Sequence, residues 1–268
     1  MRKWLLAVAA ALIFFMPVNA DEAHAVETAG WIDISEIDRG VLTVNYAVKA
    51  EVKTKLMVTK GQERYTYNLY SGRSWEHFPL QLGNGNYTVS LLENTEGNKY
   101  KVVKKQTVEL NLKNGRDVFL NSVQNIAWTS SDSAIVKAAD LTKNKKTDTE
   151  KAKAVYEYII SNIQYDNKLA SQVPADYLPD IDRTIRTRKD ICYGYASLFA
   201  AMMRSQGVPV KLTMGTSSYA KGYHAWNEAY LDGKWVTIDT TVDAGLMRSN
   251  KKYQFIKDAS KYKANRLY

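Results

Sequence analysis

The sequence contains a single cysteine, Cys192, which stands directly before an apolar stretch with helical spacing. Apolar side chains recur on one face of residues 192–206, and Gly207 and Pro209 follow as helix stop signals. A cysteine at the start of a helix faces free backbone N–H groups, and these groups stabilise an anion. Because the thiolate is the nucleophilic form of cysteine, Cys192 is a candidate nucleophile.

A thiol nucleophile needs a base, and His224 is the histidine in the most informative setting. It begins a stretch that predicts a β-hairpin, with strands at residues 224–231 and 234–239. The residues between the strands, Asp232 and Gly233, are a strong signal for a two-residue turn. The sequence therefore predicts both the strand that carries the candidate base and the strand that pairs with it.

The turn also predicts which residues of the hairpin face one another. We expect Leu231 to pair with Lys234, and the same register places Trp226 opposite Asp239. His224 shares a face with Trp226 because side chains alternate along a strand. Asp239 is then the diagonal neighbour of His224, about 7 to 8 Å away, a span that the two side chains can bridge. Such a carboxylate would hold one ring nitrogen of the histidine, so that the other could meet a thiol.

These blocks resemble a known family. Cys192 is followed by Gly194-Tyr195-Ala196, then by GVPV, and then by HAWNEAYLDGKWVTIDTT. Their order and spacing are similar to the core of the transglutaminase-like superfamily, relatives of the papain-type cysteine proteases. The resemblance covers roughly residues 150–245. It implies an α+β fold in which the nucleophile helix packs against an antiparallel sheet, and it implies that Cys192, His224 and Asp239 form the catalytic triad.

The resemblance also bears on the oxyanion donors. The family places an aromatic donor, often Trp followed by Asp, upstream of the cysteine, and Tyr165-Asp166 resembles that pair although Tyr replaces Trp. Gln164 is a competing donor, and the backbone N–H of Cys192 is another. A plain helix-end aromatic residue is an equally good interpretation of Tyr165.

Other side chains near these motifs have less specific interpretations. Tyr193, Tyr223 and Trp226 are candidates for the substrate cleft, with packing in the core, rim or sheet as the alternative, which we favour for Trp226. Asp243 and Glu228 are interpreted as ordinary surface carboxylates. The sequence predicts no metal site and no cofactor.

The elements that must position these residues fall into two predicted domains. Residues 26–120 predict an all-β sandwich of the immunoglobulin or fibronectin type, because short β-rich runs are separated by turn signals. These runs occupy residues 41–48, 55–59, 64–69, 87–92 and 99–112.

Residues 121–268 predict the transglutaminase-like domain. A helix is expected around residues 133–139, and the capping box at residues 147–150 opens a second helix that runs to about Ile163. The polar residues 164–190 predict a long loop or short turns. The tail predicts a strand at residues 253–256 and a turn of helix after Asp258, which together complete the sheet.

The first 25 residues predict a secretory signal peptide. A basic pair, Arg2 and Lys3, precedes the apolar residues 4–15, and small-residue processing sites end at Ala20 and Ala25. An uncleaved anchor is the alternative. We expect the mature protein to be secreted or attached to the cell surface, where a lone cysteine cannot form an intramolecular disulfide.

The charge of the chain bears on its partners. The formal net charge of +9 favours anionic partners such as cell-wall polymers, lipid headgroups or acidic proteins. No nucleic-acid-binding motif accompanies the basic residues, so a DNA or RNA binder is not predicted.

These observations predict a secreted acyltransferase or hydrolase that acts on carboxamide or peptide bonds of a protein or peptide substrate. Cross-linking, deamidation and proteolysis share the same triad, so all three remain open. The alternative from a different class is a cell-surface binding or scaffold protein with a non-catalytic transglutaminase-like fold.

Overall fold

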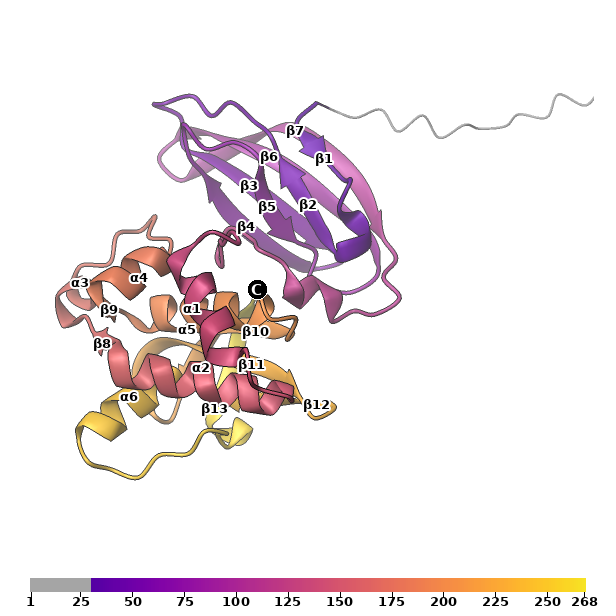
Figure 1. Ribbon diagram of the computed structural model, residues 1–268. Coiled ribbons are helices and arrows are strands. Elements are labelled where there is room, and N and C mark those ends of the chain that lie inside the picture. The colour runs from indigo at the N-terminus through magenta and orange to yellow at the C-terminus, as the bar shows by residue number, and fades with distance from the viewer. Residues whose placement is uncertain (1–29) are drawn as a thin grey trace, which may run out of the picture.

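The computed structural model describes residues 30–268, so the predicted signal peptide lies outside the described residues. An all-β part comes first along the chain, and a part made of helices and two sheets follows it (Figure 1). No helix among residues 30–268 is long and apolar enough to cross a membrane.

Two antiparallel sheets form the N-terminal part. The smaller has the strand order β1-β2-β5 and the larger the order β4-β3-β6-β7. Alternate residues of the strands point inward, so that Leu56 of the larger sheet and Leu42 and Phe78 of the smaller one are buried in the same core. The elements are β1 (Ile32–Asp33), η1 (Ile37–Arg39), β2 (Val41–Val44), β3 (Thr54–Lys60), β4 (Glu63–Leu69), β5 (Glu76–Pro79), β6 (Gly85–Glu96), β7 (Lys99–Leu110) and η2 (Asp117–Leu120).

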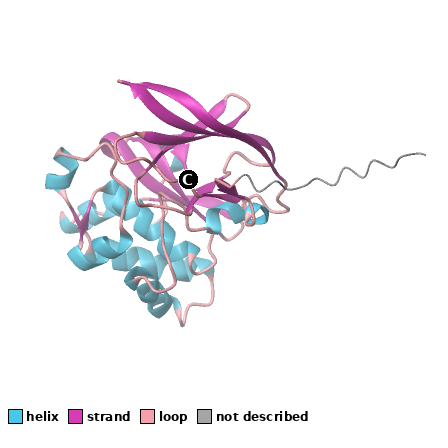
Figure 2. Cartoon of the chain, turned by 90° about the horizontal axis from the view of Figure 1, so that it is seen from above, coloured by secondary structure: helices cyan, strands magenta, loops and turns pink. Residues whose placement is uncertain are grey.

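The C-terminal part has a four-stranded antiparallel sheet with the order β12-β11-β10-β13. Its strands are β10 (Val210–Ser217), β11 (Ala220–Leu231), β12 (Lys234–Ile238) and β13 (Tyr262–Leu267). Helices gather on one side of the molecule (Figure 2). The four longest are α1 (Ser133–Thr142), α2 (Asp148–Asn162), α5 (Cys192–Arg204) and α6 (Thr240–Arg248). This mixed arrangement confirms the predicted α+β fold.

Helix α5 is the centre of the C-terminal core. Residues 194–204 are all buried, and α5 packs on β10 and β11 while α1, α2 and α6 surround it. Helix α2 begins with the predicted capping box, because the Thr147 side chain accepts from Glu150 N and the Glu150 carboxylate accepts from Thr147 N. The nucleophile helix is therefore held on several sides.

Residues 164–190 are more ordered than the predicted loop. They contain β8 (Gln164–Tyr165), α3 (Asn167–Ser171), α4 (Ile181–Thr187) and β9 (Lys189–Asp190). Strands β8 and β9 pair in parallel, with Tyr165 opposite Asp190. Asp166 caps α3 and Asp180 caps α4, so polar residues that suggested a loop serve as helix caps.

The tail forms its strand later than predicted. Residues 253–256 are not a strand; η3 (Ala259–Lys261) leads into β13, which pairs with β10. The prediction that the tail completes the sheet is confirmed, but the position of the strand was wrong. The alternating apolar residues at 253–256 were misleading because Tyr253 and Ile256 are exposed.

The end of β13 lies between the two parts of the molecule (Figure 1). The ring of Tyr268 makes edge contacts with Tyr65 and Tyr67 of β4. The buried guanidinium of Arg204 donates to the carbonyl oxygens of Asn121, Val210 and Tyr268, which belong to three separate segments. The two parts therefore share a polar and aromatic junction.

Candidate active site

Cys192 is the first residue of α5. Ile191 is the N-cap residue, with extended backbone dihedrals, and the thiol is partly exposed. The N–H groups of the first helical turn have no partner inside a helix and carry partial positive charge. The sulfur therefore lies where an anion is stabilised.

The hairpin that carries His224 has the predicted register. Leu231 pairs with Lys234, and the pairing continues to Asn227 and Ile238. Asp232 and Gly233 have φ values of 49° and 81°, and two successive positive φ values are the requirement of a type I′ turn. The short turn thus fixes the alignment of the strands on which the site is built.

This register brings His224 and Asp239 together. His224 Nε2 lies 2.8 Å from Asp239 Oδ2, and the exposed fractions of the two residues are 4% and 0%. A buried contact of this kind fixes the orientation of the imidazole ring. Because Nε2 is engaged with the carboxylate, Nδ1 is the ring nitrogen left for the thiol.

Asp239 has two further hydrogen-bond donors. The N–H of Val242 donates to Oδ1 at 3.0 Å, so Asp239 is also the N-cap residue of α6. The hydroxyl of Tyr262, on β13, donates to Oδ2 at 3.0 Å. The carboxylate is therefore held by the hairpin, by α6 and by β13 at once.

The pKa of His224 reflects this environment. Burial lowers the pKa of the imidazole, but hydrogen bonding to Asp239 and to Cys192, together with their negative charges, raises it to about 10. The protonated imidazole is consequently the stable form near neutral pH when Asp239 and a Cys192 thiolate are beside it. An imidazole that stays protonated near neutral pH can donate a proton to a neighbouring group, as a general acid does.

Trp226 covers the histidine from inside the sheet. Its ring stacks against His224 with a centroid distance of 6.2 Å and lies 5.0 Å from the ring of Tyr262. Trp226 is only 2% exposed and lines neither cavity at Cys192. It is therefore a packing residue, the interpretation favoured from the sequence, and the structure does not support it as a cleft residue.

Two cavities meet at Cys192, with volumes of about 360 and 450 Å³. Both are lined by Tyr165, Cys192, Tyr223 and His224. Tyr193 lines the smaller cavity, so the structure brings both tyrosines that were candidates for the cleft to the nucleophile.

Of the two side chains that were candidate oxyanion donors, the structure places Tyr165 beside the cysteine. Desolvation and then the charge of Cys192 raise the pKa of Tyr165, which keeps its hydroxyl protonated. Gln164 is exposed and lines neither cavity, because successive side chains of a strand point to opposite faces. The geometry therefore does not support Gln164 as a donor.

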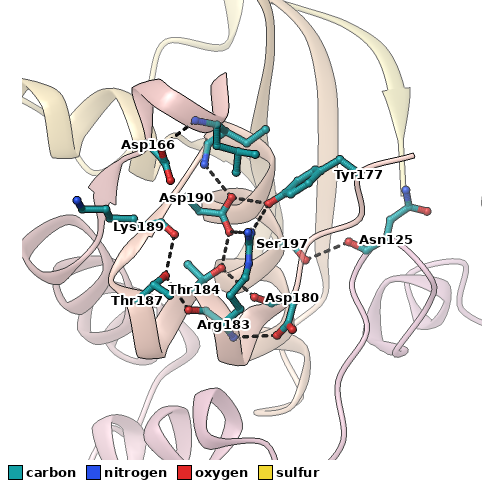
Figure 3. A network of polar contacts seen from close by, with 12 residues as sticks. Asn125, Asp166, Tyr177, Asp180, Arg183, Thr184, Thr187, Lys189, Asp190 and Ser197 are labelled. Carbon is teal, nitrogen blue, oxygen red and sulfur yellow. Dashed lines mark hydrogen bonds and ion pairs between the residues drawn. The ribbon is translucent and has the colours of Figure 1, made fainter. Parts of the chain in front are cut away.

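A buried carboxylate just before the nucleophile was missed in the sequence. Asp190 is fully buried and accepts hydrogen bonds from Tyr177, Arg183 and Thr184, which surround it in Figure 3. Asp190 also accepts from the N–H of Ile191 at 2.8 Å. Tyr177 lines the smaller cavity, so this network joins the cavity wall to the start of α5. The sequence signal for it is weak: Gly194 lies one turn later, where a Cβ would clash with the carboxyl group.

Asp243 was also misjudged, because it is buried rather than on the surface. It accepts from Tyr156 at 2.7 Å and is paired with Lys257. Glu228 is partly exposed and pairs with Lys211 at 2.9 Å. Among residues 30–268 no cluster of three or more His, Cys, Asp or Glu side chains could hold a metal ion.

Sequence comparison identifies the domain that carries this site. Residues 136–240 match the transglutaminase-like superfamily. The match confirms the transglutaminase-like resemblance that the order of the sequence blocks predicted for this part of the chain. An alignment 132 residues long, which covers 44% of this chain, shows 33% identity to kyphoscoliosis peptidase from Homo sapiens, and the Mus musculus protein of that name is 32% identical over the same length. The match spans 19% of each relative's own length.

Solved structures give weaker similarities over a longer stretch. A candidate cysteine protease from Cytophaga hutchinsonii has a TM-score of 0.44 and 16% identity, with 81% of this chain and 85% of that chain covered. The periplasmic domain of TgpA from Pseudomonas aeruginosa has a TM-score of 0.41 and 14% identity, with 81% of this chain and 93% of that chain covered.

Proposed function

We propose that the protein is a cysteine-dependent acyltransferase or hydrolase that acts on carboxamide or peptide bonds. The observation that carries the proposal is the 2.8 Å contact between His224 Nε2 and Asp239 Oδ2, next to a cysteine that lines two cavities. Cys192 is the nucleophile, His224 the acid and base, and Asp239 the residue that orients His224. Membership of the transglutaminase-like superfamily supports this assignment.

The first half of the reaction forms a thioester. The Cys192 thiolate attacks the carbonyl carbon, and the negative charge that develops on the oxygen needs hydrogen-bond donors. The backbone N–H of Cys192 and the hydroxyl of Tyr165 are the candidate donors. When the C–N bond breaks, protonated His224 gives its proton to the departing ammonia or amine.

The second half releases the acyl group. Neutral His224 takes a proton from water or from an amine as that nucleophile attacks the thioester and the C–S bond breaks. Water gives deamidation of a carboxamide or cleavage of a peptide bond, and an amine gives a cross-link. Cys192 returns to the thiolate in either case.

The competing proposal is a binding or scaffold protein with a non-catalytic domain. Buried His224 and Asp239 are costly to desolvate, and a fold that needed only packing would be served by apolar residues at those positions. This cost supports the catalytic proposal over the scaffold. Export of the protein, and anionic surface polymers as further partners, complete the proposal and rest on the sequence alone.

Mass spectrometry of one reaction mixture tests the proposal. The protein is incubated with a glutamine-containing peptide and a primary amine, so that amine addition, deamidation and backbone cleavage give different masses. We expect one of these products with the natural protein and none with the Cys192→Ala variant. Identical products from that variant would show that Cys192 is not the nucleophile.

Alkylation separates an enzyme from a scaffold. Iodoacetamide at about pH 6 should modify Cys192 much faster than it modifies glutathione, because His224 stabilises the thiolate. The His224→Gln variant should lose this advantage. Slow labelling of the natural protein, together with no product in the mass experiment, would favour the scaffold.

A further inference from the structure

The two cavities that meet at Cys192 differ in chemistry. The smaller is lined by apolar and aromatic side chains, among them Val173, Pro174, Ala175 and Met214. No Asp, Glu, Lys or Arg is among its lining residues. Taking a charged side chain into such a cavity would cost desolvation free energy, and His224, which also lines it, is already paired with Asp239.

The larger cavity carries positive charge. Lys221 and Lys251 are the charged residues of its lining apart from His224, and both are exposed. No Asp or Glu is among the lining residues of this cavity, and two carboxylates near its wall are already paired, Asp239 with His224 and Asp243 with Lys257. The two lysines therefore give the lining of this cavity positive charge.

We infer that the cleft takes a peptide segment with an apolar side chain on one side of the reacting carbonyl and a carboxylate on the other. The inference rests on the proposed function, because it places the reacting carbonyl at Cys192. Tyr165, Cys192, Tyr223 and His224 line both cavities, so one extended segment that crosses the sulfur reaches both. Each residue of such a segment advances about 3.3 Å, which puts the two selected side chains within a few positions of the carbonyl.

The positive charges of Lys221 and Lys251 also disfavour a basic substrate residue near the reacting carbonyl. A lysine or arginine side chain in the larger cavity would lie beside Lys221 and Lys251, where like charges repel. Each exposed charge pair changes an affinity by only a small factor, because water screens it. Two lysines therefore predict a preference for acid over base of about tenfold in affinity, and not an absolute requirement.

Binding to the Cys192→Ala variant tests this without turnover. The probes are fluorescently labelled, capped peptides with a central glutamine flanked by Leu and Glu, or by Leu and Lys, each in both orders. Fluorescence anisotropy should show about tenfold tighter binding of the Leu and Glu peptide than of the Leu and Lys peptide in one of the two orders. Equal affinity of acidic and basic peptides in both orders would overturn the inference.

Charge-reversal variants test whether the preference for an acidic peptide comes from Lys221 and Lys251. In the Cys192→Ala background, Lys221→Glu combined with Lys251→Glu should make the Leu and Lys peptide the tighter ligand. The matched control is Lys104→Glu combined with Lys105→Glu, two exposed residues of β7 that change the net charge equally. The control should keep the preference for acid, and loss of that preference in both variants would show an effect of net charge alone.

A separate variant tests the preference for an apolar side chain in the smaller cavity. Val173→Asp, at a partly exposed wall of the smaller cavity, should remove the advantage of Leu over Asp as the apolar flank while the preference for Glu at the other flank stays. About 0.5 M NaCl should weaken the preference for Glu and leave the preference for Leu, because salt screens charges and not apolar contacts. A preference for Leu that survives Val173→Asp would contradict this assignment of the smaller cavity.

The experiments distinguish a failure of this inference from a failure of the proposed function. Fast alkylation of Cys192 in the natural protein with no peptide preference would overturn the inference alone. Slow alkylation with the peptide preference intact would overturn the proposed reaction and leave a binding cleft of the inferred specificity.

Discussion

Tyr262 donates its hydroxyl to Oδ2 of Asp239 at 3.0 Å, the same oxygen that His224 contacts. Two donors on one carboxylate oxygen share its negative charge, so Tyr262 limits how strongly Asp239 raises the pKa of His224. Tyr262 acts through Asp239 and is therefore a positioning residue.

Tyr262→Phe tests this shared contact. The loss of one donor should raise the pKa of His224 by up to about one unit, because Asp239 then interacts with the imidazole alone. It should also lower the free energy of unfolding by about 1 kcal/mol. An NMR titration of the His224 ring protons measures the first effect. An unchanged or lower pKa would show that Tyr262 only packs against Trp226.

The contribution of Asp239 to the free energy of unfolding should depend on pH. The pKa of folded His224 is raised above the value of about 6.5 for an unfolded histidine. The stabilisation is then fully present below about pH 6.5 and is lost as the pH rises through the folded pKa. We expect Asp239→Asn to cost about 2 kcal/mol more at pH 6 than at pH 10.

The measurement of this pH dependence needs the Cys192→Ala background, which removes the coupled thiol. Urea unfolding of the single and the double variant at both pH values gives the difference in free energy. The loss of the α6 N-cap is the same at both pH values and cancels. A difference that grows with pH would contradict the His224–Asp239 interaction.

Asp190→Asn should loosen the start of α5. Asparagine keeps the shape but loses the charge that faces Arg183 at 2.8 Å. Because Asp190 is buried while Arg183 is partly exposed, the loss should cost about 2 kcal/mol. Urea unfolding measures the cost, and the alkylation rate of Cys192 should fall because the helix start moves. The control is Asp180→Asn, which alters the cap of α4 and should cost about 1 kcal/mol or less without changing the alkylation rate. Equal alkylation rates in both variants would remove the positioning role of Asp190.

Gly194→Ala should be destabilising although alanine favours helices. A Cβ at residue 194 would lie 2.0 Å from Cγ of Asp190, so the buried network would have to move, at a cost of about 2 kcal/mol. Gly245→Ala in α6 is the matched control, since nothing lies within 4 Å of its added Cβ. The control should gain about 0.5 to 1 kcal/mol from helix propensity. Thermal unfolding of the two variants should therefore shift in opposite directions, and a stabilised Gly194→Ala variant would show that the network yields freely.

The parts of the site that local signals define were predictable. The Asp232-Gly233 turn sets the register of a two-stranded hairpin, and register alone places Asp239 within reach of His224. The capping box of α2 likewise involves residues three positions apart. Such features depend on a few neighbouring residues, and the sequence displays them directly.

The contacts that were missed join distant segments. Asp243 resembled a surface carboxylate because its partners, Tyr156 and Lys257, lie far from it in the sequence. Tyr262 reaches Asp239 only because β13 pairs with β10, and no local pattern predicted that strand. The burial of Asp190 depends on the loop that carries Tyr177 and on α4, which the polar composition concealed.

Strand β13 touches the two parts of the molecule at its opposite ends. Tyr268, just beyond one end, packs against Tyr65 and Tyr67, and Tyr262 at the other end donates to Asp239. The six residues of β13 therefore connect the aromatic junction between the two parts of the molecule to the carboxylate that orients His224. The position of the N-terminal sheets and the geometry of the candidate active site thus depend on one continuous strand.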